Sequence, residues 1–493
     1  MKAINYIRRF IGVITLIVIT SCELQELNID PNRVNDAPIS VILPSAQANL
    51  VWGMNDFAAQ STSSFVQYLT GTLNVQINVT NYGPFPANFD VTWSNHFYAG
   101  AMKDLRTIIA KSTDEGALHY RGVAKIMMAM AIGQLVDLWG DVPYSQALDL
   151  ATFPHPEYEA GATLYQEMFS LLNQGIEDLN STSSYSPTRN DLMLTPPANS
   201  EASWRTNSLP RWIKTANALK ARYHNHLSKL DPEGSADAAL AAIAAGTFLS
   251  NAEEMKVAFG TGTNDSAGPW FSFLLGTFGL NNINVCATFV NLLRDRVAPG
   301  VNDPRLPFYV SPNASNQFVG TPLGATSIGS TSSRLGPFIN TNAAPTNIIT
   351  YAEIKFIEAE ARFRKNQFAE AAEALNDAIK ANILRVTGAP SPAYEAIYAS
   401  ENETTIQVNG LQKIFTEKYI AMFLQTEAWV DWRRSIPTGA AGTVSGIPAL
   451  TPPPNNETSG VFPRRFLYPQ NELVANSANV PSKTLTDKVF WDN

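Results

Sequence analysis

The spacing of apolar and polar residues predicts a mainly helical protein. Apolar residues recur every three or four positions in residues 95–111, 117–138 and 164–179, the period of an amphipathic α-helix. A further helix is expected from Pro210, a residue suited to a first helical turn, to about Leu230. In the second segment one broad apolar face collects Ala124, Met127, Met128, Ala131, Leu135 and Leu138.

Residues 351–383 predict one tetratricopeptide-like helix pair. The spacing of such a repeat is reproduced by Ala359, Phe368, Ala371, Leu375 and Ala378. The alanines let two antiparallel helices approach closely, and the larger residues fill the space between them. Because one such unit cannot bury its own apolar face, we expect the other helix pairs to stack beside it.

Four long stretches lack this periodicity: 181–209, 260–284, 298–347 and 436–470. Loops of this length are usually either functional or disordered. They carry aromatic residues such as Trp270, Phe308 and Phe338, which disordered segments tend to lack. We therefore expect ordered loops on a helical frame.

The N-terminus has the features of an export signal. Three basic residues precede an apolar run from Phe10 to Ile19, which is too short to span a hydrocarbon core of ~30 Å as a helix. The stretch ITSC, ending at Cys22, has the form of a bacterial lipobox, in which the cysteine thiol carries the lipid. An ordinary signal peptide with an incidental cysteine is the alternative. The expected organisation is a signal peptide at 1–21, a lipidated Cys22, a tether over about 22–35 and one domain within 22–493.

The charge balance argues against nucleic acid as a partner. The chain has 35 basic and 43 acidic residues, and removal of residues 1–21 would take away three basic ones, leaving a net charge of −11. An acidic surface repels phosphate backbones. After lipidation of Cys22 only Cys286 remains, so no intramolecular disulfide is expected and stability must come from packing.

Motifs of the common enzyme classes do not occur in the sequence. There is no G-x-S-x-G elbow, H-E-x-x-H pair, Walker loop or EF-hand loop. His224 and His226 form a close pair, but a spacing of two on a helix points the rings to different sides and makes a poor metal site. We expect neither a metal nor another cofactor.

Asp137 and Asp141 are the best local candidates for the two carboxylates of a glycoside hydrolase. The surrounding segment DLWGDVPYSQAL also has a structural explanation. Gly140 suits the left-handed turn that ends a helix, and Pro143 prevents the helix from resuming. Asp141 can accept hydrogen bonds from amides of the turn. We favour this stop and turn over catalysis.

Two arginine-containing segments are interpreted as structural. Arg433 lies within about one helical turn of Trp429 and Trp432, where it can stack on an indole and hold neighbouring helices together, although it could hold a ligand in the same way. Arg464 and Arg465 belong to an extended segment, PRRFLYPQNEL. There they are expected to satisfy carbonyls or carboxylates of the helices beneath.

Six stretches, in order along the chain, resemble the SusD/RagB family of Bacteroidetes outer-membrane lipoproteins: LWGDVPYSQAL, TLYQEMFSLLNQGIEDL, NDPRLPFY, YAEIKFIEAEARF, EAWVDWRR and PRRFLYPQNEL. With the lipobox, the resemblance runs from Cys22 to the terminal KVFWDN. It implies a mainly α fold, a right-handed superhelical scaffold of tetratricopeptide-like pairs with long irregular loops. It also implies lipid anchoring at the outer face of the outer membrane, as a lid on a SusC-like TonB-dependent transporter.

Proteins of this family bind their ligands through variable loops, so the matched motifs transfer no binding residue. A sugar ring rests its C–H faces on exposed aromatic rings, while amides read its hydroxyls. Two loops, residues 78–93 and 264–279, offer such side chains. The candidate ligand-binding residues are Asn81, Tyr82, Phe85, Asn88, Phe89, Trp270, Phe271 and Phe278. The same rings could instead pack their loops onto the core, and Trp93 and Tyr98 look structural.

The expected function is capture of oligosaccharide at the cell surface and its delivery, unchanged, to the SusC-like transporter. A peptide cargo, as in RagB-like members, is the alternative within the family. Two other classes stay open. One is a surface glycoside hydrolase with unmarked carboxylates, and the other is an interaction scaffold that binds peptides along the helical stack.

Overall fold

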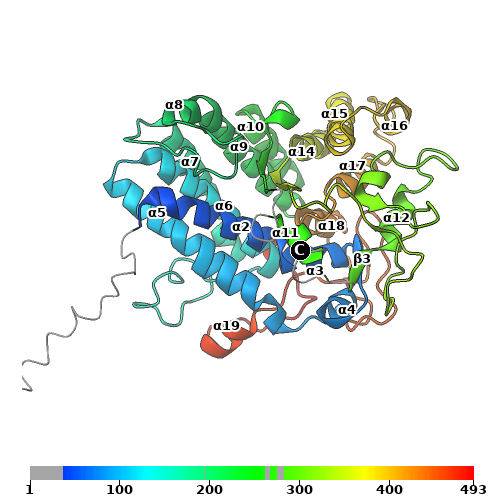
Figure 1. Cartoon of the computed structure of the whole chain (residues 1–493), viewed down its shortest axis with the longest axis horizontal. Helices are drawn as coiled ribbons and strands as arrows, with labels where there is room; N and C mark the ends of the chain where they lie inside the picture. The colour runs from blue at the N-terminus through cyan, green and yellow to red at the C-terminus, as the bar shows by residue number, and fades with distance from the viewer. Residues whose placement is uncertain (1–36, 195, 261–266, 275–281) are drawn as a thin grey trace, which may run out of the picture.

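The computed structural model describes residues 37–194, 196–260, 267–274 and 282–493. The predicted signal peptide, Cys22 and the tether lie outside the described residues. Within them the chain is mainly helical, with long loops (Figure 1).

The first half of the chain forms helices that include the π-helix η3. Their bounds are Ile39–Asn55 (α2), Phe57–Phe65 (α3), Asn74–Thr80 (α4), Pro86–Phe89 (η2), Val91–Met102 (η3), Lys103–Asp114 (α5), Leu118–Trp139 (α6), Gly161–Asn180 (α7), Glu201–Ser203 (α8), Trp204–Ser208 (η4), Leu209–His226 (α9), Leu227–Lys229 (η5) and Pro232–Ala244 (α10).

The second half has shorter helices and longer loops. Its helices are Asn251–Glu253 (η6), Pro269–Leu274 (α11), Ala287–Leu293 (α12), Leu306–Tyr309 (α13), Tyr351–Arg364 (α14), Phe368–Thr387 (α15), Pro392–Tyr398 (α16), Gly410–Ala421 (α17), Glu427–Ser435 (α18), Gln470–Ala475 (α19) and Phe490–Asp492 (η7). Three short antiparallel pairs tie the loops together: Leu69–Gly71 (β1) with Ile283–Val285 (β3), Met255–Val257 (β2) with Thr346–Ile349 (β6), and Val310–Ser311 (β4) with Arg334–Leu335 (β5).

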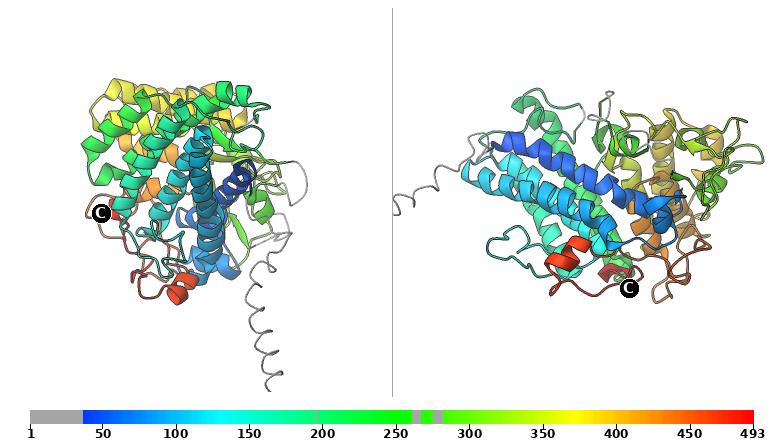
Figure 2. Two further views of the ribbon diagram at one scale, coloured as in Figure 1. Left: turned by 90° about the vertical axis from the view of Figure 1, so that its left-hand side faces the viewer. Right: turned by 60° about the horizontal axis from the view of Figure 1, so that its bottom comes forward.

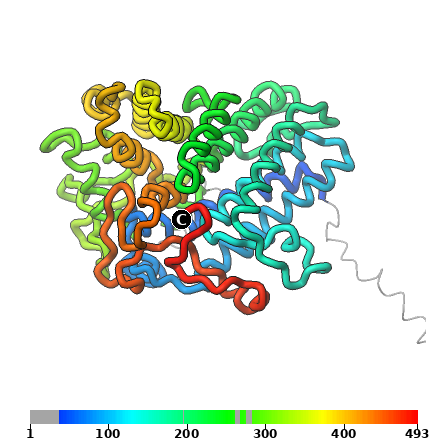
Figure 3. Tube along the Cα trace, turned by 180° about the vertical axis from the view of Figure 1, so that it is seen from behind, coloured from blue at the N-terminus to red at the C-terminus, as the bar shows by residue number. Residues whose placement is uncertain are grey.

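Helix pairs pack into a continuous array. α6 pairs with α7, α9 with α10 and α14 with α15, while α7 contacts α9 and α10 contacts α14. The array can be followed in Figure 1 and from behind in Figure 3. α6 and α7 meet at glycines: a Cβ on Gly122 would lie 2.8 Å from the carbonyl oxygen of Gly175, so only glycine permits this close backbone approach.

α14 and α15 are the predicted tetratricopeptide-like pair. Ala359, Ala371, Leu375 and Ala378 are buried in one cluster between these helices. α15 runs to Thr387, four residues beyond the predicted end, and Gly388 terminates it in the left-handed conformation at φ 77°. The predicted mainly α fold, built on such pairs and long loops, is confirmed.

α6 is buried on nearly every side, whereas its sequence pattern predicted one broad apolar face. It is packed by α2, α5, α7 and α9, which leaves little of it for solvent. Its length and composition would also suit a membrane span, but 94% of that apolar stretch is buried inside the protein. Among the described helices it is the only one of this kind, and its burial marks it as the central core helix.

α2 lies alongside the rod formed by η3 and α5 (Figure 2). Pro44 sits inside this helix and has no N–H to donate to the carbonyl of Ser40. The side-chain amide of Asn190 donates to Ser40 O at 3.1 Å instead. A loop residue thus satisfies the carbonyl that the proline leaves unpaired.

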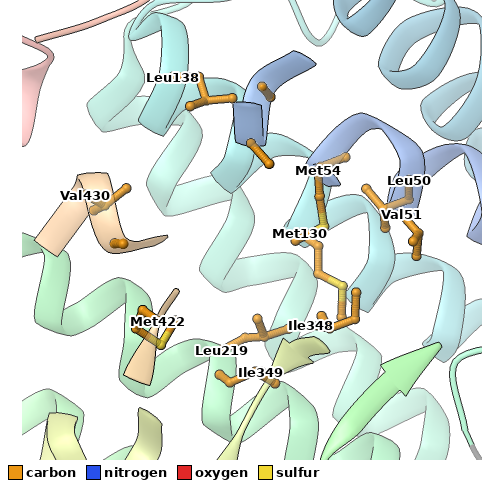
Figure 4. Close-up of a cluster of buried hydrophobic side chains, with 14 of the residues drawn as sticks. Leu50, Val51, Met54, Met130, Leu138, Leu219, Ile348, Ile349, Met422 and Val430 are labelled. Atoms are coloured by element: carbon orange, nitrogen blue, oxygen red, sulfur yellow. The ribbon is translucent and has the colours of Figure 1, made fainter. Parts of the chain in front are cut away.

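The core joins segments that are distant in the sequence. Figure 4 shows buried side chains from α2, α6, α9, β6 and the region of α18: Leu50, Val51, Met54, Met130, Leu138, Leu219, Ile348, Ile349, Met422 and Val430.

The predicted turn after α6 is confirmed, with one correction. Gly140 ends the helix at φ 82°. Asp141, however, does not bond amides of the turn, because its Oδ1 accepts from Gly161 N at 2.9 Å and so braces the start of α7. Asp137 is buried and has other partners, so the two carboxylates do not act as a pair.

A chain of buried charges links α6, α9, α14 and α18. His226 Nδ1 lies 3.3 Å from Asp137 Oδ2, and its Nε2 lies 2.8 Å from Glu427 Oε1. Arg222 Nε lies 2.6 Å from Glu353 Oε1 and 3.8 Å from Glu427 Oε2. Each of these five buried side chains therefore faces an opposite charge, which offsets the cost of its burial.

The two neighbouring histidines have opposite environments. Burial alone would lower the pKa of His226, but the carboxylates of Glu427 and Asp137 outweigh it and raise that pKa to about 9. His224 instead stacks on Phe169, with ring centroids 4.1 Å apart, and burial lowers its pKa to about 4. The prediction that these rings point to different sides is confirmed.

The last residues of the chain enter the core. Trp491 donates its indole N–H to Asp137 Oδ1 at 2.9 Å. Asp492 is fully buried and accepts from Arg464 Nε at 2.6 Å and from Lys229 Nζ at 2.9 Å. The C-terminal segment therefore belongs to the central packing.

The arginines assigned a structural role hold backbone in place. Arg433 stacks 3.7 Å from the centroid of the Trp429 ring and donates to the carbonyls of Arg464 and Asp137. Arg465 donates to the carbonyl of Trp139. Together with the Arg464 carboxylate contact, these bonds confirm the structural interpretation of both segments.

The His226 pairing predicts a pH-dependent stability. The folded pKa of about 9 exceeds the unfolded value of about 6.5, so the stabilisation is fully present below about pH 6.5 and is lost as pH rises through 9. In urea titrations, the free energy of unfolding of the wild type should fall by roughly 2–3 kcal/mol more between these two pH values than that of His226→Gln. His224→Gln is the matched control and should show the wild-type fall. Equal pH profiles for wild type and His226→Gln would contradict the assignment.

Candidate functional site

A hollow of about 350 Å³ opens over α2, between the loops at 191–197 and 257–260. Trp52 and Phe259 are half-buried and present ring surface to it. The rest of its wall is mostly apolar and includes Ala48, Val51, Leu192, Leu194, Pro197 and Val257. The size and apolar lining are those of a small-molecule site.

The floor of the hollow is a closed polar cluster around Asp191. Gln47 donates to Asp191 Oδ1 at 2.8 Å. The indoles of Trp204 and Trp212 donate to Oδ2 at 2.9 and 2.7 Å. Gln47 Oε1 accepts from Leu192 N at 2.6 Å. The cluster locks α2 to the 191–197 loop, so the hollow is preformed.

Trp52, on one wall, is positioned by η3. Its ring lies against His96 of η3, with ring centroids 6.3 Å apart and planes 23° apart. His96 Nε2 lies 3.6 Å from Asp56 Oδ2. The half-buried Trp52 ring is thereby held in place, and the polar side chains of the lining itself are Gln47 and Asp191.

The described part of the predicted loop 264–279, residues 267–274, lies beside this hollow. α11 contacts α2, and a Cβ on Gly268 would lie 3.2 Å from Phe259 Cδ2. Trp270 is buried and packs against Phe273, so its ring serves the loop's own packing. Phe271 is half-exposed. Phe278 lies outside the described residues.

The other predicted loop, 78–93, lies against the C-terminal segment. Tyr82 and Phe89 are buried, against Phe65 and Phe462 and against Phe57 and Phe466 respectively. Burial leaves these two rings no free face for a sugar. The burial of Tyr82 and Phe89 therefore argues against the prediction that they contact ligand.

The remaining candidates in that loop, Asn81, Phe85 and Asn88, are closer to solvent. Asn88 Oδ1 accepts from Phe85 N at 2.8 Å, and the carbonyl of Asn81 accepts from Glu457 N at 2.8 Å. Phe85 is 60% exposed. Its neighbour Pro86 lines a separate hollow of about 270 Å³ with Tyr468 and Leu473. The described residues of the two predicted loops do not line a common pocket.

Trp52 was missed by the sequence reasoning, because the whole of α2 was missed. Its period is visible in Leu43, Ala46, Leu50 and Met54, which are all buried, but Pro44 inside the helix conceals it. If one proline is allowed within the helical period, the sequence predicts both α2 and the half-buried Trp52 on it.

Among the described residues that line the hollow, Asp191 is the one acid, and both of its oxygens already accept hydrogen bonds. Glycoside hydrolysis needs two carboxylates about the scissile bond, and this lining does not supply such a pair.

Comparison with known proteins identifies the family. The SusD-like family model, described as "Starch-binding associating with outer membrane", matches residues 31–469. The chain therefore belongs to the SusD-like family, as its sequence motifs indicated. No curated protein matches it.

Solved structures share the fold over nearly the whole chain. A chitin-binding protein is 23% identical with a TM-score of 0.73, covering 92% of this chain and 100% of its own. A SusD/RagB family protein from Bacteroides thetaiotaomicron is 21% identical, with a TM-score of 0.74 and coverage of 93% and 99%. A chitin-binding SusD homolog from Flavobacterium johnsoniae is 19% identical, with a TM-score of 0.71 and coverage of 92% and 98%.

The Asp191 cluster predicts a local stability requirement. Asp191→Ala would leave Gln47 and the indoles of Trp204 and Trp212 without their acceptor, which should lower the free energy of unfolding by roughly 3 kcal/mol. Asp56→Ala is the matched control at the outer edge and should cost less than about 1 kcal/mol. Urea titration followed by tryptophan fluorescence measures both. Equal losses would show that the cluster does not brace the hollow.

Proposed function

We propose that this protein is a non-catalytic carbohydrate-binding lipoprotein of the cell surface. It captures oligosaccharide and delivers it to a SusC-like TonB-dependent transporter. The observation that carries the proposal is the preformed hollow with the half-exposed Trp52 and Phe259 rings at its wall. Sugar C–H faces rest on such rings, and nearby polar groups read the hydroxyls.

The rigidity of the hollow supports this role. Trp52 is held by His96, and α2 is held through Gln47 and Asp191. A ring that is already positioned loses little conformational entropy when ligand binds. Weak sugar contacts can therefore add up to useful affinity.

The names of the family and its structural neighbours support a neutral glycan. The family is described as starch-binding, and two neighbours are described as chitin-binding. Both polymers are uncharged chains of pyranose rings without the dense negative charge that an acidic protein would repel. A neutral oligosaccharide therefore fits both the apolar wall and the excess of acidic residues.

The proposed place of action rests on the lipobox-like Cys22 and the family. The family description includes association with the outer membrane, and a lipid on Cys22 would supply the anchor. A tethered binder can hold cargo at the mouth of a transporter. Peptide cargo is the competing possibility within the family and enters the test below.

Binding of short chitin and starch oligosaccharides by isothermal titration calorimetry tests the function. Trp52→Ala should weaken binding about tenfold, because the ring face contributes roughly 1 kcal/mol or more. Phe85→Ala, in the other predicted loop, should leave the affinity for short ligands unchanged.

If Phe85→Ala weakens binding and Trp52→Ala does not, the binding site lies at the 78–93 loop instead. Binding of peptides but not of any glycan would exclude oligosaccharide as cargo. If chromatography of the incubated oligosaccharides detects shorter products, the non-catalytic assignment is overturned.

Anchoring predicts a second, separate result. Cys22→Ala should remove the lipid site, and the protein should move from the membrane fraction to the soluble fraction after cell lysis. Immunoblotting of the fractions measures this. The glycan affinity of the purified variant should equal that of wild type, which separates anchoring from binding. Unchanged membrane association would contradict the assignment of Cys22.

A further inference from the structure

A second, larger hollow of about 470 Å³ lies on the other side of η3. Its walls come from η3, the 143–156 loop and α19. The lining combines rings, prolines and aliphatic side chains with a few polar groups, and it includes Trp93, Ser94, Lys103, Leu150, Glu472 and Ala475.

Trp93 carries an unused donor at this hollow. It is only 2% exposed, yet its indole N–H donates to no acceptor within the described part of the chain. Five other buried indoles have protein acceptors, namely those of Trp139, Trp204, Trp212, Trp432 and Trp491, whereas the indole N–H of Trp429 is buried without one. Unlike that of Trp429, the Trp93 N–H is not sealed in the core, and Trp93 lines the hollow, so a bound ligand can supply its acceptor.

The same stretch of η3 and α5 supplies two more free donors. Neither the Ser94 hydroxyl nor the Lys103 ammonium bonds any residue that the structure describes. On the opposite wall Glu472 Oε2 accepts from the Tyr158 hydroxyl at 2.9 Å, and its Oε1 accepts from no described residue. The lining thus includes one cation, Lys103, and one carboxylate, Glu472, among mostly apolar side chains, so the hollow suits an uncharged ligand rich in hydroxyls.

The mouth of the hollow is apolar and open. Leu150 lines it and is 63% exposed, while Val474 of α19, beside the lining residue Ala475, is 72% exposed. Exposed apolar side chains that gather around a hollow mark a contact surface rather than ordinary protein surface. They offer cover for the C–H faces of a sugar ring.

η3 contributes to the surroundings of both hollows. His96 of η3 stacks on Trp52, which lines the hollow over α2, whereas Trp93, Ser94 and Ala99 of the same helix line the second hollow. A helix with its side chains is ~10–12 Å across, a span that one extended glycan can cross.

We propose that the second hollow binds another sugar unit of the same glycan chain, so that the protein holds long chains at two points. The inference rests on the proposed function, since it concerns the same cargo. Once one site is occupied, the other site meets the remaining chain at a high effective concentration. Affinity then rises with chain length, although each site alone is weak.

The experiment compares a disaccharide with long oligosaccharides of the same neutral glycan, for chitin and for starch, by titration calorimetry. For wild type the long chain should bind at least about tenfold more tightly per molecule than the disaccharide. Trp93→Phe removes the free N–H but keeps a ring, and Leu150→Ser removes the apolar mouth. Both should reduce long-chain affinity to near the disaccharide level, while disaccharide binding at the Trp52 hollow stays unchanged.

Leu249→Ser is the matched control, because Leu249 is an exposed leucine, 76% accessible, that lines neither hollow. It should behave as wild type. Unchanged long-chain affinity in both Trp93→Phe and Leu150→Ser would overturn the second site while leaving the proposed function intact. Failure of wild type to bind any glycan would overturn the proposed function and this inference together.

Discussion

The fold depends on charged side chains that are buried away from solvent and must therefore pair with one another. His226 lies between Asp137 and Glu427, and Arg222 continues the chain to Glu353. These residues come from four helices, so no single helix can shift without exposing an uncompensated charge to an apolar interior. The buried charges therefore oppose helix shifts, while apolar packing around α6 supplies stability.

This rigidity reaches the surface through α2. The helix packs on α6 and η3, and Gln47 ties it to Asp191 and the two indoles beneath. A ligand at Trp52 therefore meets a wall that is set by the core rather than by a mobile loop. The long loops contribute rims and floors, while the position of the ring is decided by helix packing.

The sequence predicted the fold more completely than it predicted the candidate site. Regular periodicity predicted α6, α7 and α9, and the alanine spacing of the repeat predicted α14 and α15, because these features depend on local geometry. Tyr82 and Phe89 were judged by residue type and loop context, but burial depends on which distant segment covers a ring. The strand pairs join residues that are distant in the sequence, about two hundred positions apart for β1 with β3, and no local sequence pattern predicts such pairing. Trp52 was lost with α2, since Pro44 broke the expected period.

The buried Trp491 and Asp492 have a consequence for how the molecule folds. Their partners Asp137, Lys229 and Arg464 are spread over most of the chain, so the contacts of these two residues join distant segments and cannot form from local structure alone. Individual helix pairs can form early, but the interior closes only when Trp491 and Asp492 dock into it.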